Sequence, residues 1–300
     1  MNAPLVVLAG ATGDLGSRIA RDLIRRGARV RALVRPGGSA AKPDDSMGRA
    51  IQRVQVSFDD PVALTKACEG GVIVVSALSG LRPVIVGVQS RLLTAAVQAG
   101  VPRFIPSDFA IDFTRIPEGW NRNLNLRNEF RQVLESAPIR PTSILNGAFT
   151  DMLTGLAPFI LYRWKRILCW GDPDQPMDWT TIDDTAVYTA AAALDPDTPR
   201  FLRIAGDQLS ARSMAAMMSD LTGTPYRIFR PGGPGLLKLM VSLTRAFTPS
   251  SDDVYPPWQG MQYMHNMYSG IAKFPSLDNE RYPMNWRRAH EVISKHLASL

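Results

Sequence analysis

The sequence predicts an α/β protein with a doubly wound parallel sheet, followed by a smaller and mostly helical C-terminal region. Two observations lead to this prediction. A glycine-rich turn near the N-terminus joins an apolar run to a helical pattern, and apolar runs then alternate with helical patterns through the first half of the chain. The chain has 300 residues, 45% of them hydrophobic and 20% charged, which is enough for a large core in one domain, or in one domain with a smaller partner.

The glycine-rich turn reads G-A-T-G-D-L-G from Gly10 to Gly16 and follows the apolar run 5–9. A helix is expected after it, because Leu15, Ile19 and Leu23 recur every four residues. In a dinucleotide-binding turn, the three glycines allow a tight turn, a close approach to the pyrophosphate, and close packing of helix on strand. The helix start adds N–H groups and a partial positive charge. We therefore expect nucleotide binding, with a plain strand–helix turn as the alternative.

The second strand, expected over 29–34, ends at Arg35. Folds that prefer NAD usually carry an acidic residue about 20 residues beyond the glycines, where it binds the ribose 2′-hydroxyl. Arg35 stands in that region instead, and a guanidinium suits a 2′-phosphate through charge-assisted bonds. The sequence thus favours NADP over NAD, the alternative being that Arg35 is a solvated charge at a strand end.

The remaining elements complete a Rossmann-type sheet, in which ligands lie beyond the carboxyl ends of the strands. We expect strands over 53–58, 72–77, 103–106 and 142–145, and helices over 60–70, 83–99 and 127–136.

The second half is less regular. We expect a hairpin within 167–181, a helix over 186–194 capped by 183–185, and a strand near 201–206 that returns to the main sheet. This divides the chain into a nucleotide-binding domain over 1–150 and a smaller substrate-binding region over 151–300. Helices beyond 230 would form a lid. There Met261, Met264 and Tyr268 are candidates for an apolar substrate pocket, although each may equally be core.

Composition and charge narrow the class of protein. No cationic segment followed by an apolar one marks a secretory signal, and no apolar run approaches the roughly 18–20 residues that span a bilayer. Cys68 and Cys169 are too few and too far apart for a disulfide framework or a metal site, which favours a cytoplasmic protein without metal. The net charge of +7 comes from scattered basic residues, so a polyanionic cofactor explains it better than nucleic acid does.

Several motifs in order resemble the NmrA-like and isoflavone-reductase-like group of atypical short-chain dehydrogenases/reductases. Besides the glycine turn and Arg35, the strongest is F-I-P-S-D-F-A over 104–110, which is similar to the F-x-P-S-E-F-G of that group. The similarity continues in segments 146–149, 171–172, 183–186 and 278–283, and so covers nearly the whole chain.

The resemblance implies roles for individual positions. The pyrophosphate would be held by Gly10, Thr12, Gly13, Asp14, Leu15 and Gly16, and the 2′-phosphate by Arg35. Phe58 and Asp59 would flank the adenine, while Ser76 and Ala77 would pass under the cofactor. The nicotinamide and substrate would be bordered by Ser107, Asp108, Phe109, Asn146, Gly147 and Phe149. For Ser107 and Asp108 a simple capping role is an equal alternative, and Phe149 may be core.

The reductase branch of this group carries a lysine in the pattern K-x-x-V-R-R-x-x-E, and this chain departs from it. Arg127 occupies the lysine position in R-N-E-F-R-Q-V-L-E. An arginine keeps its proton at working pH, so it cannot act as a general base, but it can stabilise an oxyanion or bind an acidic group. The chain also lacks the Tyr-x-x-x-Lys pair of ordinary short-chain dehydrogenases.

Two classes of function follow. The first is an NADPH-dependent reductase of a hydrophobic, aromatic or quinone-like small molecule, with Arg127, Ser107 and Asp108 as candidate catalytic residues. The second is a non-catalytic NADP(H) sensor that reports to a protein partner. A homo-oligomer is compatible with either.

Overall fold

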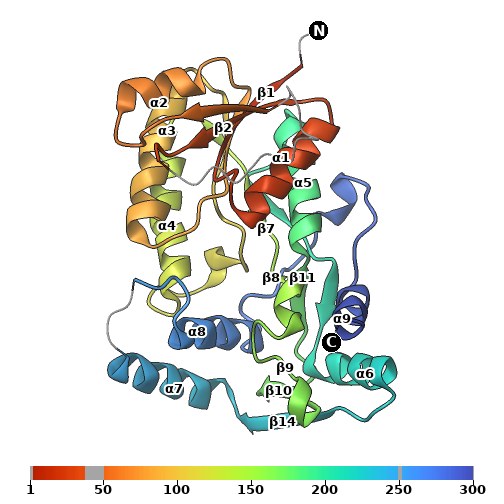
Figure 1. The fold of residues 1–300 in the computed structure, drawn as a ribbon. Coiled ribbons are helices and arrows are strands. Elements are labelled where there is room, and N and C mark those ends of the chain that lie inside the picture. The colour runs from red at the N-terminus through yellow and green to blue at the C-terminus, as the bar shows by residue number, and fades with distance from the viewer. Residues whose placement is uncertain (1–2, 38–50, 249–251, 300) are drawn as a thin grey trace. The chain divides into compact units, whose positions relative to one another are not determined.

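A computed structural model describes residues 3–37, 51–248 and 252–299 (Figure 1). The chain forms two compact units that interleave along the sequence. The first unit comprises Met1–Phe109, Leu126–Ile144 and Ile182–Leu202, and the second comprises Ala110–Asn125, Leu145–Thr181 and Arg203–Leu300. These units are defined by packing and not by what they bind, so the functional division expected at residue 150 stays a prediction.

The first unit is built on a six-stranded parallel sheet with the strand order β3-β2-β1-β4-β5-β6, which confirms the predicted Rossmann-type fold. Its strands are β1 (Leu5–Ala9), β2 (Arg29–Val34), β3 (Ile51–Gln55), β4 (Ile73–Ser76), β5 (Arg103–Ile105) and β6 (Arg140–Pro141). Its helices are α1 (Asp14–Arg25), α2 (Pro61–Cys68), a π-helical turn η2 (Pro83–Val88) that leads into α3 (Gln89–Gln98), most of α4 (Arg122–Glu135), and α5 (Ile182–Leu194).

Helices cover both faces of this sheet, as the uninterrupted apolar strands require. Figure 1 shows α2, α3 and α4 on one side of the sheet and α1 with α5 on the other. On the first side, Val7 and Phe104 of the strands belong to the same buried cluster as Leu64, Leu92 and Phe130 of the helices. This core fixes the strand ends where the expected cofactor residues lie.

Several element boundaries in the first half differ from the sequence prediction. The helix expected over 127–136 begins at Arg122, because the Asn121 side chain caps it by accepting a hydrogen bond from the Leu124 N–H at 3.2 Å. The strand expected over 53–58 ends at Gln55, because the chain turns between Ser57 and Asp60. The Asp60 N–H donates a hydrogen bond to the Ser57 carbonyl at 3.2 Å.

The strand expected over 142–145 is divided. β6 belongs to the main sheet, whereas β7 (Ser143–Leu145) pairs with β12 (Phe201–Arg203) in a separate two-stranded sheet. The strand expected to return to the main sheet therefore pairs with β7 instead. The expected cap 183–185 lies inside the first turn of α5, which begins at Ile182.

The second unit contains two three-stranded sheets, ordered β14-β10-β9 and β13-β11-β8. The strands are β8 (Ala148–Phe149), β9 (Ile160–Leu161), β10 (Arg166–Trp170), β11 (Met177–Thr180), β13 (Asp207–Leu209) and β14 (Arg227–Gly232). The longer helices are α6 (Ala211–Thr222), α7 (Pro234–Phe247), α8 (Pro257–Tyr268) and α9 (Ala289–Leu297). Short 3-10 turns are η3 (Phe113–Arg115), η4 (Thr150–Thr154), η5 (Tyr162–Trp164) and η6 (Asn279–Arg281).

The prediction of a hairpin within 167–181 is wrong. Its two strands, β10 and β11, lie in different sheets, because β10 pairs with β9 and β14 while β11 pairs with β8 and β13. The turn residue Gly171 continues the β10–β14 pairing through its N–H, which donates to the Gly232 carbonyl at 3.0 Å.

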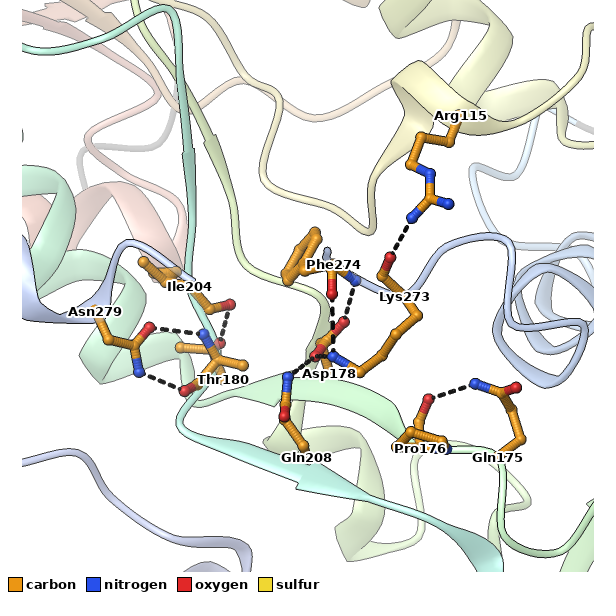
Figure 2. A network of polar contacts seen from close by, with 11 residues as sticks. Arg115, Gln175, Pro176, Asp178, Thr180, Ile204, Gln208, Lys273, Phe274 and Asn279 are labelled. Carbon is orange, nitrogen blue, oxygen red and sulfur yellow. Dashed lines mark hydrogen bonds and ion pairs between the residues drawn. The ribbon is translucent and has the colours of Figure 1, made fainter. Parts of the chain in front are cut away.

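A buried carboxylate, Asp178 on β11, bonds the segment after α8 to the sheet β13-β11-β8 (Figure 2). It accepts hydrogen bonds from Lys273 Nζ, from Gln208 Nε2 and from the Phe274 N–H, each at 2.8 Å. Three donors satisfy the buried charge, so the segment after α8 is held against β11. Among the described residues, no helix combines the length and apolar character needed to cross a membrane.

Candidate active site at the strand ends

The predicted nucleotide turn lies at the switch point of the first unit's sheet. From β1 the strand order runs one way to β2 and β3 and the other way to β4, β5 and β6, so the switch point lies at the carboxyl ends of β1 and β4. Gly10 follows β1 and Ala77 follows β4, and the Ala77 N–H donates to the Ala9 carbonyl at 2.9 Å. The sequence therefore brings the glycine turn to the place where this fold binds ligands.

Two of the three glycines are required by the protein's own backbone. Gly10 has φ +84°, and a Cβ on it would lie 2.4 Å from the Ala77 carbonyl oxygen. A Cβ on Gly16 would lie 2.0 Å from the Gly10 carbonyl oxygen. At Gly13, by contrast, a Cβ would meet only that same oxygen, at 3.4 Å. Internal packing explains Gly10 and Gly16, but it does not explain Gly13.

The start of α1 is open to an anion. Gly13 is the N-cap residue and supplies no side-chain acceptor, and both it and Thr12 are exposed. The neighbouring carboxylate is engaged elsewhere, since Asp14 pairs with Arg18 at 2.7 Å and Arg18 also pairs with Asp183 at 2.5 Å. The first N–H groups of the helix thus keep their hydrogen-bonding capacity and their partial positive charge.

The ends of β4 and β5 carry buried polar groups beside this turn. Ser76 is fully buried, and its Oγ finds no hydrogen-bond partner within the described parts of the chain. Ser107 is committed to structure: its Oγ donates to the Leu78 carbonyl at 2.6 Å and its N–H donates to Gln89 Oε1 at 2.9 Å. Gln89 is fully buried, and no motif in the sequence marks it as a site residue.

Asp108 lies in a buried cluster of charges. The residue is 1% exposed, and its Oδ2 accepts a hydrogen bond from Ser143 Oγ at 2.6 Å. Ser143 Oγ in turn accepts from Arg200 Nη1 at 2.7 Å. Burial raises the pKa of Asp108, and this effect outweighs the Ser143 hydrogen bond and the charges of Arg127, Arg200 and Arg131.

Arg127 belongs to the same cluster. It is 9% exposed, and its positive charge acts on the Asp108 carboxyl. The fold thus brings Arg127 of α4 near Asp108, and both are residues that the sequence placed in the site. Ser143 and Arg200 complete the arrangement, and no local pattern in the sequence could have found them.

The residues expected around the adenosine differ in their exposure and in their protein partners. Arg35 is exposed beyond β2, and no described residue pairs with its guanidinium. Phe58 is buried in the core next to α2 and α3. Asp59 pairs with Arg91 at 3.1 Å, and Arg91 also donates to the Phe58 carbonyl at 3.0 Å. Arg35 is therefore the residue of this group that is left open to a ligand.

The second unit holds the other expected site residues. Asn146 is fully buried, and neither end of its amide side chain has a hydrogen-bond partner among the described residues. Gly147 has φ +67°, and a Cβ on it would lie 2.3 Å from the Asp178 carbonyl oxygen, so packing on β11 explains this glycine. Phe149 and Met261 are half-buried, and Phe109, in the first unit, is buried.

Two candidates for the substrate pocket are buried in the second unit. Met264 is buried on α8, and Tyr268 packs against Phe159 with ring centroids 6.1 Å apart. The Tyr268 hydroxyl donates to the Leu168 carbonyl, and burial raises its pKa. These contacts are those of a core residue, so a pocket role for Tyr268 rests on the sequence alone.

Residues 2–236 match the family model described as the NmrA-like family. The chain belongs to the NmrA-like family. Pinoresinol reductase 1 from Arabidopsis thaliana is 31% identical over 217 residues, which span 64% of this chain and 65% of that protein. A bifunctional pinoresinol-lariciresinol reductase from Linum album is 30% identical over 97% of this chain and 94% of its own length.

A comparison with solved structures supports the same fold. The structure of AtPrR2 with NADP+ and (+)pinoresinol superposes with a TM-score of 0.81 at 22% identity, covering 99% of both chains. The family membership and the fold inferred from the motifs are therefore confirmed. For this member of the NmrA-like family, the roles of individual site residues stay predictions.

The buried Asp108 generates a prediction about stability. Because its pKa is raised in the folded state, the folded protein binds this proton more tightly than the unfolded chain does. Its contribution to stability is present at low pH and is lost as the pH rises from about 4 through the raised pKa. Asp108→Asn removes this dependence, so the free energy of unfolding of the variant should rise relative to wild type across that range.

Urea unfolding at several values between about pH 4 and pH 8 measures this difference. Asp59→Asn changes an exposed aspartate of the same unit and serves as the control. A difference between Asp108→Asn and wild type that stays constant with pH, or that shrinks as the pH rises, would contradict the account of Asp108.

Proposed function

We propose that this protein is an NADPH-dependent reductase of a hydrophobic aromatic small molecule. One observation above all supports the proposal. At the switch point of the sheet, backbone atoms occupy the space that a Cβ would need at Gly10 and Gly16, but not at Gly13. The internal packing of a tight turn does not require a glycine at position 13. A pyrophosphate does, because it must approach the backbone there.

The residues around the turn fit NADP(H). The open helix start would take the pyrophosphate, and the exposed Arg35 guanidinium would take the 2′-phosphate. The unpaired Ser76 Oγ at the end of β4 is a buried polar group that a ligand at the strand ends would satisfy. When bound, NADPH supplies a hydride. A neighbour of the same fold was solved with NADP+, which supports this choice.

The substrate class is inferred from relatives. Two of them are pinoresinol and pinoresinol-lariciresinol reductases, and the neighbour bound to NADP+ also holds (+)pinoresinol, an aromatic molecule. In this chain the candidates for the apolar contacts are Phe109 in the first unit and Phe149, Met261, Met264 and Tyr268 in the second. A small hydrophobic ligand is the expected partner, and a cytoplasmic location, a homo-oligomer and a protein partner stay predictions.

Arg127 cannot serve as a general acid or base in this proposal. A guanidinium does not give up its proton at working pH, so any proton required must come from solvent or substrate. We assign to Arg127 the role of a fixed positive charge that holds Asp108 and stabilises negative charge on a substrate oxygen. Ser107, with both its polar groups bonded to the protein, positions the end of β5.

The cofactor assignment is tested at Arg35. Arg35→Asp replaces attraction of the 2′-phosphate by repulsion, and should weaken NADPH binding by about 2–4 kcal/mol. NADH lacks this phosphate, so its affinity should change far less and serves as the internal control. Fluorescence titration of both cofactors measures the two affinities. An equal loss for NADPH and NADH would remove Arg35 from the site.

The reaction is tested by turnover. Purified protein should oxidise NADPH with a subset of quinones, enones, aromatic carbonyls and benzylic ethers. Arg127→Met should then lower kcat/KM by about 10²–10³, the loss typical of one oxyanion-stabilising donor, while NADPH affinity stays within a few fold. Arg127→Lys keeps a positive charge beside Asp108 and should retain more turnover than Arg127→Met.

Two outcomes would change the proposal. Unchanged turnover in Arg127→Met would reduce the arginine to a packing role. Tight NADPH binding without turnover on any of these substrates would contradict the reductase and favour an NADP(H) sensor.

A further inference from the structure

A pocket of about 90 Å³ lies within the second unit, where α7 and α8 run side by side (Figure 1). Its walls include Trp120 from the loop before α4, Lys238, Ser242 and Arg245 from α7, and Gln262 and His265 from α8. These residues played no part in the argument for the reductase, and they differ in character from the apolar core around them.

The pocket is positively charged. Lys238 and Arg245 stand seven residues apart on α7, so they share one face of the helix across two turns. Lys238 Nζ lies 4.5 Å from the Trp120 ring centroid, and the Arg245 guanidinium lies 5.3 Å from that of Trp258. No carboxylate lines the pocket, and no described acidic side chain forms an ion pair with either cation.

The neighbouring groups do not offset this charge. His265 packs edge-on against Trp120 with ring centroids 5.0 Å apart, and burial together with the Lys238 charge lowers the pKa of its imidazole. Burial and the Arg245 charge likewise lower the pKa of Arg122, although Asp253 acts in the opposite direction. His265 is therefore neutral at pH 7, and the two cations of α7 set the sign of the potential.

Charge, aromatic surface and size together specify a ligand. Two cations that form no ion pair with a described carboxylate favour an anion, and the Ser242 hydroxyl and Gln262 amide add hydrogen-bonding groups beside them. Trp120 offers a ring wall at the same pocket. The pocket volume of about 90 Å³ is below the roughly 150 Å³ of an apolar cavity that encloses one benzene molecule, so this open pocket takes a single ring only in part and excludes a larger skeleton.

We propose that this pocket binds a small aromatic carboxylate, with the carboxylate held by Lys238 and Arg245 and the ring packed against Trp120. The site lies wholly in the second unit and goes beyond the proposed reductase activity. Its ligand need not be reduced, so its test does not depend on turnover or on NADPH.

Benzoate is the probe, and isothermal titration calorimetry on the wild-type chain without cofactor measures its binding. Benzamide keeps the ring without the charge, and acetate keeps the charge without the ring. Benzoate should bind at least tenfold more tightly than either, with quenching of tryptophan fluorescence. Lys238→Met and Arg245→Met should each weaken benzoate binding by about tenfold to a hundredfold, since each removes a charged hydrogen-bond partner.

Lys295→Met removes an equal charge from an exposed position on α9 and should leave benzoate affinity unchanged. Lys238 and Arg245 are themselves exposed, so their variants should keep the wild-type melting temperature. Three results would overturn the proposal: no benzoate binding at millimolar concentration, unchanged affinity in both α7 variants, or acetate binding as tightly as benzoate. The last would indicate a general anion site.

Discussion

The close contact between the β1–α1 turn and the end of β4 is the constraint on which the rest of the first unit depends. Gly10 touches the backbone of Ala77, and Gly16 touches the backbone of Gly10, so neither position has room for a side chain. This packing places the first turn of α1 at the switch point of the sheet, beside the carboxyl ends of β1 and β4. The Arg18–Asp183 ion pair then links α1 to α5, with which it packs on one side of the sheet.

A second constraint is the buried charge at the end of β5. Asp108 is 1% exposed, and it is surrounded by Ser143 and by arginines from α4 and from the segment before β12. Burying a carboxylate is unfavourable unless it is paired and hydrogen-bonded. The charge of the arginine at the family's lysine position therefore acts on a carboxyl group of its own chain.

The elements that could be predicted from the sequence are those that short-range patterns determine. β1 and β2 follow from runs of apolar and β-branched residues, and the glycine turn follows from its spacing. The start of α4 was missed because Asn121, which caps it, stands well before the apolar pattern begins. The 167–181 hairpin failed because β10 finds its partners far along the chain, in β14.

In the candidate site, too, some residues follow from local patterns and others only from contacts between distant segments. Gly10 and Gly16 could be identified because the local backbone dictates their type, whereas the roles of Gly13 and Arg35 toward a ligand stay predictions. Arg200 and Ser143 could not, since only folding brings them to Asp108. Gly147 was assigned to the cofactor, yet its positive φ and its contact with Asp178 give it a purely internal reason. In each case the missing information is a contact between distant segments.

The most direct test of the account is the affinity of Gly13→Val for NADPH. The backbone at Gly13 has φ −78° and ψ 167°, which valine adopts readily, and its side chain would meet no close protein backbone. The variant should keep the circular dichroism and melting behaviour of the wild type within the cost of a poorer helix cap. We expect it to lose NADPH binding in a fluorescence titration, because the side chain occupies the place of the pyrophosphate. Wild-type affinity in a folded Gly13→Val protein would contradict the nucleotide site and, with it, the proposed reductase.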